Sequence, residues 1–446
     1  MGKYYNSAEE IYEADKAYNM HSWSTQGAIS PKVIEKAEGI FFWDSTGKKY
    51  YDMSSQLVNL NIGYGNKKVI EAMKDQAEKM PYIGPGFAME ERSALAQKII
   101  EVAPDNMAKV FFTLGGADAN ENAIKIAKQY TGRSKVFSRY RSYHGSTHGA
   151  GNLTGEPRRY PMEPGIPGFV KFMDPYLYRC SLPFASEEAA TKYYVDQLRE
   201  QVIYEGRDKV ACIVMETVTG SNGIIIPPTG YMEGVRAICD EFGILMICDE
   251  VMAGFGRTGK WFAVENFNVK PDLITFAKGV TSGYVPLGGV IVCDKVAKFF
   301  DTNFLSCGLT YQAHPMGMAA GCASIEFFKE SNLLGHVEEM GKLLGTLLEE
   351  VKTKHESVGD VRYIGLFSCV ELVKDKGTKE PLVPYGIDPQ GLMKKVVGML
   401  IAKGFFTYTH ENYVFVCPPL IIVEKELREA IEILDEVLSD VDKMIK

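Results

Sequence analysis

The fold of this chain is decided by the stretch ILMICDEVMAGFGRTGKWFAVENFNVKPDLITFAKGVTSGYVPLGG, residues 244–289. It begins with an apolar run of strand length that ends in Asp249, and further along a second short apolar run ends in Lys278. Ligands of a parallel α/β sheet bind at the carboxyl ends of the strands. We therefore expect both charged side chains to point into one crevice. The alternative is that each meets solvent at the end of its strand.

A lysine at the end of a buried strand is costly, because its ammonium group must be desolvated or paired. The position suits an amine that serves as a nucleophile, and a carboxylate across the site suits a protonated ring nitrogen. Pyridoxal 5′-phosphate is the cofactor that uses both partners. The pair Lys278 and Asp249 therefore indicates a site for this cofactor.

Composition and charge argue against several classes of protein. The chain has 446 residues and is 46% hydrophobic, enough for a large core and more than one domain. Its net charge is −8 and no block of Lys or Arg stands out, so we expect neither nucleic acid nor a membrane surface as a partner. Nine scattered cysteines without a CxxC motif, a polar N-terminus and the lack of a long apolar run favour a cytoplasmic protein. We expect no metal site.

Two further segments supply candidate cofactor contacts. Gly115, Gly116 and Ala117 lie between a predicted strand and a predicted helix, where backbone N–H groups can bind phosphate. A turn with a purely structural role is the alternative. Tyr143 and His144 follow another predicted strand, and an aromatic ring at such a place can cover one face of a planar cofactor.

The flanks of the two charged residues resemble the signature of the class III (ω-) aminotransferases, a fold type I pyridoxal-phosphate family. These flanks are DEVMAGFGRTG, residues 249–259, and KGVTSGYVPLGG, residues 278–289. The resemblance implies an α/β fold, with a large domain built on a mostly parallel seven-stranded sheet between helices and a small α+β domain. We expect an N-terminal arm and part of the small domain in residues 1–79, the large domain in residues 80–329 and the C-terminal small domain in residues 330–446. The Gly- and Pro-rich residues 150–185 are expected to form a long loop over the site.

The resemblance also implies roles for single residues. Lys278 binds the cofactor covalently and moves a proton during catalysis, Asp249 keeps the ring nitrogen protonated, and Glu216 lies near the phenolic edge of the ring. Thr310 reaches the phosphate site of a neighbouring subunit, which implies a homodimer or a dimer of dimers. The expected cofactor contacts are Gly115, Gly116, Ala117, Tyr143, His144, Glu216, Asp249, Val251, Lys278 and Thr310.

The substrate pocket departs from the better-known members of the family. Ser146, Ser221 and Tyr408 stand where GABA-type enzymes carry an arginine, a glutamate and a second, mobile arginine. Together with His21-Ser22-Trp23 and Gly155-Glu156-Pro157-Arg158, this pattern is most similar to the taurine aminotransferases, a branch of the family.

The similarity predicts ping-pong transfer of an amino group from an ω-amino compound, taurine or a similar β-amino acid, to 2-oxoglutarate or pyruvate. Arg158, rather than Arg159, is predicted to bind the sulfonate or carboxylate, and Trp23 to line the pocket or donate its indole N–H. Under the alternative, both arginines are solvated loop charges. Other enzymes on the same fold stay open: an ω-amine or polyamine:pyruvate transaminase, an aminomutase, a racemase or a decarboxylase.

Overall fold

The computed structural model describes residues 4–445. Residues 1–3 and 446 lie outside the described residues. They belong to the first and third predicted segments, and residues 1–3 begin the polar N-terminus. A seven-stranded sheet forms the centre of the molecule, in the order β4-β10-β9-β8-β7-β5-β6. Its strands are β4 (Met107–Thr113), β5 (Lys135–Arg139), β6 (Phe169–Phe172), β7 (Val210–Glu216), β8 (Leu245–Asp249), β9 (Leu273–Phe276) and β10 (Gly288–Cys293).

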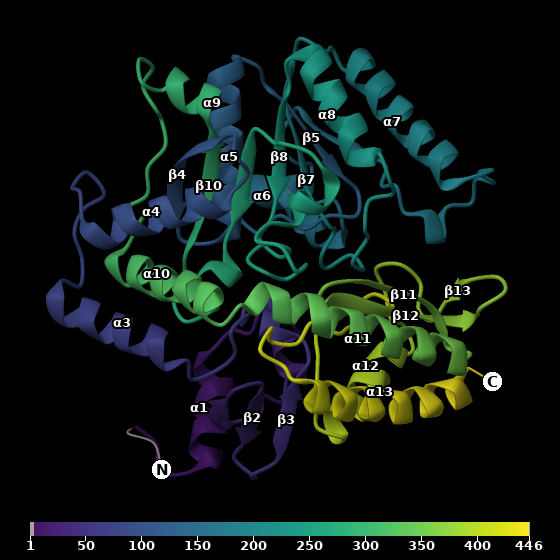
Figure 1. Ribbon diagram of the computed structural model, residues 1–446. Coiled ribbons are helices and arrows are strands. Elements are labelled where there is room, and N and C mark those ends of the chain that lie inside the picture. The colour runs from purple at the N-terminus through teal and green to yellow at the C-terminus, as the bar shows by residue number, and fades with distance from the viewer. Residues whose placement is uncertain (1–3, 446) are drawn as a thin grey trace.

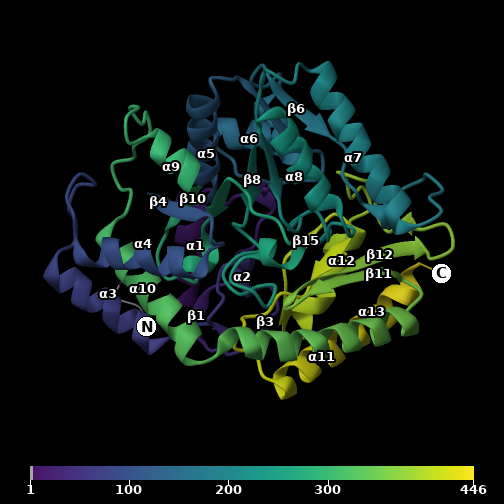
Figure 2. The same cartoon turned by 45° about the horizontal axis from the view of Figure 1, so that its top comes forward.

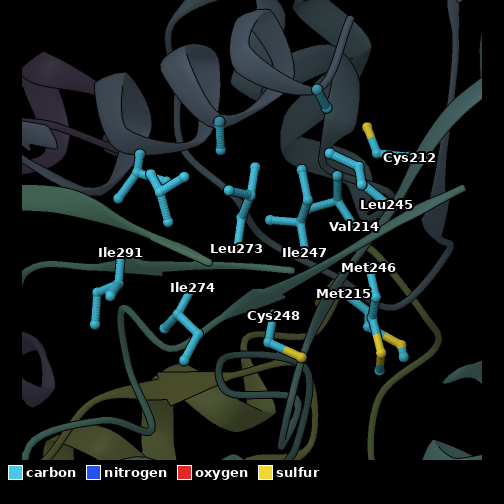
Figure 3. Packing of buried hydrophobic residues seen from close by; sticks show 14 of the residues in the cluster. Cys212, Val214, Met215, Leu245, Met246, Ile247, Cys248, Leu273, Ile274 and Ile291 are labelled. Atoms are coloured by element: carbon cyan, nitrogen blue, oxygen red, sulfur yellow. The ribbon is translucent and has the colours of Figure 1, made fainter. Parts of the chain in front are cut away.

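Only β10 runs antiparallel to its neighbours, β4 and β9, whereas the other neighbouring strands are parallel. The predicted mostly parallel sheet of an α/β fold is therefore confirmed. Successive side chains of a strand point to opposite faces, and Figure 3 shows this alternation in the core. Leu273 and Ile247 point to one face, and their neighbours Ile274 and Cys248 point to the other. Both faces are apolar because helices cover both.

Helices surround this sheet in the upper part of the molecule (Figure 1). Between residues 67 and 330 the α-helices are, in chain order, α3 (Lys67–Lys79), α4 (Glu90–Val102), α5 (Gly116–Thr131), α6 (His148–Leu153), α7 (Glu187–Tyr204), α8 (Tyr231–Phe242), α9 (Asp294–Phe299) and α10 (Pro315–Glu330). Among residues 4–445, no helix is both long enough and apolar enough to cross a membrane.

Two smaller sheets lie below the large one, next to α11 (Leu333–Lys354), α12 (Leu392–Ala402) and α13 (Glu424–Met444) (Figures 1 and 2). One sheet joins both ends of the chain: β1 (Ile34–Glu38), β2 (Phe41–Asp44), β3 (Lys49–Asp52) and β14 (Phe405–Phe406). The other contains β11 (Val358–Ile364), β12 (Phe367–Asp375), β13 (Glu380–Pro381), β15 (Thr409–His410) and β16 (Tyr413–Phe415). One apolar cluster joins residues of both chain ends, from Ile40 to Val441, so these segments pack as one body. The domain limits at residues 80 and 330 remain predictions.

The structure differs from the predicted elements in two places. Residues 150–185 are not one loop, because they contain β6, which pairs in parallel with β5 at the edge of the large sheet. The N-terminal arm is not a simple extension, because it contains the helix α1 (Ala8–Tyr18) and the strand β1. Both unexpected strands are short, with four and five residues, which makes them hard to recognise from periodicity.

Candidate active site

Asp249 is the last residue of β8, and three partners hold its buried carboxylate. Oδ2 accepts a hydrogen bond from Asn120 Nδ2 at 2.8 Å and lies 2.7 Å from His144 Nδ1. Oδ1 accepts from Val251 N at 2.9 Å. Asn120 is itself fixed, because Thr275 Oγ1 donates to its Oδ1 at 2.9 Å. A carboxylate oxygen can accept two hydrogen bonds, so Oδ1 has a position left for a ligand.

Lys278 follows β9 and lines the same cavity as Asp249, a space of about 240 Å³. Its backbone is left-handed, with a φ of 47°, a conformation that costs energy in a residue other than glycine. Burial lowers the pKa of its amine to about 8, against the charges of Asp249 and Glu216, which raise it. A neutral amine is therefore available at mildly alkaline pH, as a nucleophile or a general base requires.

Glu216 ends β7 and lies beside Asp249, because the two residues are paired in the parallel register of β7 and β8. Its Oε1 accepts from Tyr143 N at 2.9 Å, and its Oε2 accepts from Gly220 N at 2.7 Å. Burial raises the pKa of this carboxyl group. Glu216 thus holds together the loops that follow β5 and β7, and it lines the cavity.

The start of α5 lies against the loop that follows Asp249. A Cβ atom added to Gly116 would come within 2.7 Å of Val251 Cγ1, so only glycine permits this close approach. On the other side, a Cβ at Gly145, whose φ is +133°, would meet Ala117 Cβ at 2.5 Å. Gly116 and Ala117 therefore stand at the cavity with their helix N-terminus towards it, where backbone N–H groups and the helix dipole favour an anion.

Arg158 enters the cavity from the short helix η2 (Pro157–Met162). Its guanidinium lies over the ring of Tyr143, 3.9 Å from the centroid, and 5.7 Å from the ring centroid of Trp23. Both aromatic residues also line the cavity. The structure therefore brings Trp23, from the N-terminal arm, together with Tyr143 and Arg158.

Two of the residues that distinguish this chain from GABA-type enzymes surround the same guanidinium. Arg158 Nη2 donates to Ser221 Oγ at 2.9 Å, and Tyr408 lines the cavity beside it. Burial raises the pKa of Tyr408 to about 12, so its hydroxyl is neutral. Arg159 is turned away: its Nε lies 3.0 Å from Glu163 Oε1, and it does not line the cavity.

Most of the residues predicted for the site meet in this one cavity. The predicted residues that line it are Trp23, Gly116, Ala117, Tyr143, His144, Arg158, Glu216, Asp249, Val251 and Lys278. Gly115 only caps α5, one residue before the lining residues. Thr310 lies on the surface, where its carbonyl accepts from Tyr82 Oη at 2.7 Å. Its role in a neighbouring subunit remains a prediction.

The sequence did not point to several residues of the site. Asn120 donates a hydrogen bond to Asp249. Its position as a polar residue on the apolar face of a predicted helix could have indicated that it has a buried hydrogen-bond partner. Leu57 and Val58 line the cavity from a loop with left-handed backbone, including a φ of 55° at Val58. No sequence signal indicates this conformation, because β-branched residues rarely adopt it.

Several known proteins that are similar to this chain are named aminotransferases. The family Aminotransferase class-III matches residues 24–438. The crystal structure of taurine:2-oxoglutarate aminotransferase from Bifidobacterium kashiwanohense, in complex with PLP and glutamate, superposes with a TM-score of 0.97 at 48% identity, covering 99% of this chain and 100% of that one. The taurine–pyruvate aminotransferase of Bilophila wadsworthia is 34% identical over 450 residues, covering 97% of this chain and 98% of its own length.

The similarity extends to enzymes named for other amines. The putrescine–pyruvate aminotransferase of Pseudomonas aeruginosa is 32% identical over 428 residues, covering 92% of this chain and 90% of its own length. The family match covers most of the chain and agrees with the cavity in which Lys278 and Asp249 meet. The chain therefore belongs to the class III aminotransferases and is an enzyme of that family.

Proposed function

We propose that this aminotransferase takes the amino group of an ω-amino compound with an anionic tail, for which taurine is the best candidate, and transfers it to 2-oxoglutarate or pyruvate. The observation that supports the proposal is Arg158, an arginine on the wall of the cavity that also contains Lys278. Guanidinium groups bind carboxylates and other oxyanions through paired hydrogen bonds. The names of two similar enzymes, from Bifidobacterium kashiwanohense and Bilophila wadsworthia, point to the same donor.

Class III aminotransferases use pyridoxal 5′-phosphate, and the residues of this cavity fit it. Val251 packs directly against Gly116, which is possible only because glycine has no Cβ. The start of α5, at this place, offers backbone N–H donors for a phosphate. Asp249 Oδ1 has a free acceptor position for the N–H of a pyridinium ring. The bound cofactor supplies an electron sink for the substrate carbon that carries the amine.

Lys278 and Asp249 perform complementary tasks in this proposal. Lys278 would hold the resting cofactor through its ε-amine. Once a substrate amine had displaced it, the free and neutral ε-amine would carry the proton from the substrate carbon next to nitrogen to a carbon of the cofactor. Asp249 would accept a hydrogen bond from the ring N–H and so keep the ring nitrogen protonated, while His144 and Asn120 hold the side chain of Asp249 in place. Tyr143, fixed through its backbone by Glu216, covers the ring.

The proposal includes a second subunit and a cytoplasmic location. Thr310 lies on the surface of its own subunit, away from its own cavity, which agrees with a role at a neighbour's phosphate site in a homodimer. All nine cysteines are free, which suits a reducing compartment.

The lysine is tested by Lys278→Ala. We expect turnover to fall by at least about a thousandfold, because the base and the covalent attachment are lost together. The visible absorbance of the attached cofactor should disappear as well. Turnover at the wild-type rate would contradict the assignment.

The anion site is tested by Arg158→Ala with two donors, taurine and the uncharged-tail amine 1-aminopropane. Loss of a charge-assisted hydrogen bond should lower kcat/KM for taurine by roughly 10- to 100-fold, with little change for 1-aminopropane. An equal loss with both donors would contradict a specific anion role. A second candidate, a polyamine:pyruvate transaminase, is favoured by the similarity to the putrescine enzyme, and it predicts faster turnover of putrescine than of taurine.

A further inference from the structure

Glu156 is a buried carboxylate directly behind the guanidinium of Arg158. Its side chain is 0% exposed, and Oε1 accepts a hydrogen bond from Arg158 Nε. Its other oxygen, Oε2, lies 3.3 Å from His410 Nε2. Although burial raises it, the contacts with His410 and Arg158 leave the pKa of Glu156 lowered, so the group is ionised. Glu156 itself does not line the cavity, whereas Arg158 does.

The guanidinium is therefore held on three sides. Glu156 binds its Nε, Ser221 Oγ accepts from Nη2 at 2.9 Å, and one face lies on the ring of Tyr143. Only the remaining part of the group is presented to a ligand in the cavity. Its orientation is fixed before the substrate arrives, which reduces the entropy lost on binding.

The same carboxylate also reduces the positive charge that a ligand meets. The other titratable groups around it are His410 and its neighbour Glu411, which lies 3.9 Å from His410 Nε2, together with two tyrosines. The ring of Tyr408 lies parallel to that of His410, and the charge of Glu156 contributes to the raised pKa of Tyr385. Of the groups that touch Glu156, only Arg158 is cationic at every accessible pH. The pair Arg158–Glu156 is nearly neutral, so a ligand meets the local field of one guanidinium edge and no net cation.

From this geometry we infer that Glu156 determines the charge of the tail that the site accepts, selecting amines with a singly charged tail over amines with a doubly charged one. This inference rests on the proposed function, in which Arg158 binds the tail. A sulfonate or carboxylate adds one negative charge to the nearly neutral pair. A dianion adds two charges to a partly buried place, where desolvation is far more costly, and the nearly neutral pair offers no net positive charge to offset that cost.

Taurine and 2-aminoethylphosphonate form the decisive pair of donors, because they share a skeleton and differ in tail charge. Near pH 8 the phosphonate carries close to two negative charges, as a phosphate monoester does. We expect the wild-type enzyme to prefer taurine. Glu156→Gln keeps an oxygen for Arg158 Nε and removes the charge, so it should raise kcat/KM for the phosphonate relative to taurine by about tenfold.

The matched control is Glu163→Gln. Glu163 is the partner of Arg159, on the same short segment, but neither residue lines the cavity. This variant should leave the ratio of kcat/KM for the two donors at its wild-type value. An equal shift in both variants would overturn the inference, because it would show only a change in the overall field.

A measurement on the wild-type enzyme makes the test independent of the folding of the variant. Ethanesulfonate and ethylphosphonate are compared as competitive inhibitors from pH 6 to pH 8.5. As the phosphonate loses its second proton, its inhibition constant should rise several-fold relative to that of the sulfonate. The sulfonate keeps a single charge over this range, so dividing by its inhibition constant corrects for titration of the protein. A ratio that stays constant or falls would overturn the inference.

The inference and the proposed function fail in different ways. If Arg158→Ala does not change the preference for taurine over 1-aminopropane, the anion role of Arg158 is wrong, and the role of Glu156 is wrong with it. If Arg158→Ala removes this preference while Glu156→Gln leaves the ratio of phosphonate to taurine unchanged, the proposed function stands and only the role of Glu156 is wrong.

Discussion

Lys278 is the residue on which the chemistry depends, and the surroundings of its amine predict the pH at which the amine becomes neutral. Because burial lowers its pKa to about 8, the neutral, reactive form should appear some two units below the usual range of lysine. We expect the rate at which the cofactor-free protein takes up pyridoxal phosphate to rise with pH through a midpoint near 8. Stopped-flow absorbance between pH 6.5 and pH 10.5 measures it. A midpoint at the ordinary value of a lysine would contradict the burial of the amine.

Asp249→Asn provides the internal control for this titration. The charge of Asp249 raises the pKa of Lys278, so its removal should move the midpoint to lower pH, even though the variant loses turnover. Asp272→Asn serves as a comparison, because Asp272 is also buried but pairs with Arg236 and Lys295 instead. That variant should leave the midpoint in place.

At the scale of an element, the loop around α2 (Ser55–Val58) has a strained backbone, and the buried carboxylate of Asp52 is one of the groups that hold it. Ser55, Gln56 and Val58 all have φ between 48° and 59°. Asp52 Oδ1 accepts from Gln56 N at 2.9 Å, and its Oδ2 accepts from Tyr64 Oη at 3.0 Å. The strain is tolerated because these bonds over-determine the loop. The loop in turn presents Leu57 and Val58 to the cavity.

Asp52→Asn should therefore affect both stability and substrate binding. An amide N–H₂ would face donors that the carboxylate satisfies, so we expect a loss of about 1–3 kcal/mol in the free energy of unfolding and a several-fold rise in KM. Asp44→Asn is the control, because Asp44 is also buried and accepts from Tyr50 Oη at 2.7 Å, in a hairpin turn that does not line the cavity. It should cost similar stability without a change in KM. Urea unfolding and steady-state kinetics of both variants decide between the two effects.

At the scale of the whole molecule, the sequence predicts what depends on local pattern. Asp249 and Lys278 were predictable because each ends an apolar run, and strand ends of a parallel sheet face one crevice. The helix Glu424–Met444 also depends on local pattern, because seven of its apolar residues recur on one buried face. The strand β6 was not predicted, because its four residues lie within a Gly- and Pro-rich segment and gain strand structure only by pairing with β5.

The rest of the site depends on contacts between distant segments. The left-handed backbone at Val58 is imposed by bonds such as Ser55 Oγ to the carbonyl of Cys417, which is far away in the sequence. The contact of Glu156 with His410 likewise joins segments that meet only in the folded chain. No local pattern encodes such pairs, so a single sequence cannot reveal them.

The shared active site is the prediction that concerns the whole assembly. Thr310 is exposed on its own subunit, and α1 near the N-terminus has no buried residue, so both are available to a second copy of the chain. We expect a dimer in sedimentation, and an inactive Thr310→Glu variant, because its carboxylate would repel the neighbour's phosphate. When Thr310→Glu and Lys278→Ala are unfolded and refolded together, half of the dimers should contain one intact site. About a quarter of the wild-type activity should then return.

Thr302→Glu, which changes another exposed threonine of the same segment, is the control and should stay active. A mixture no more active than its two components would contradict the shared site.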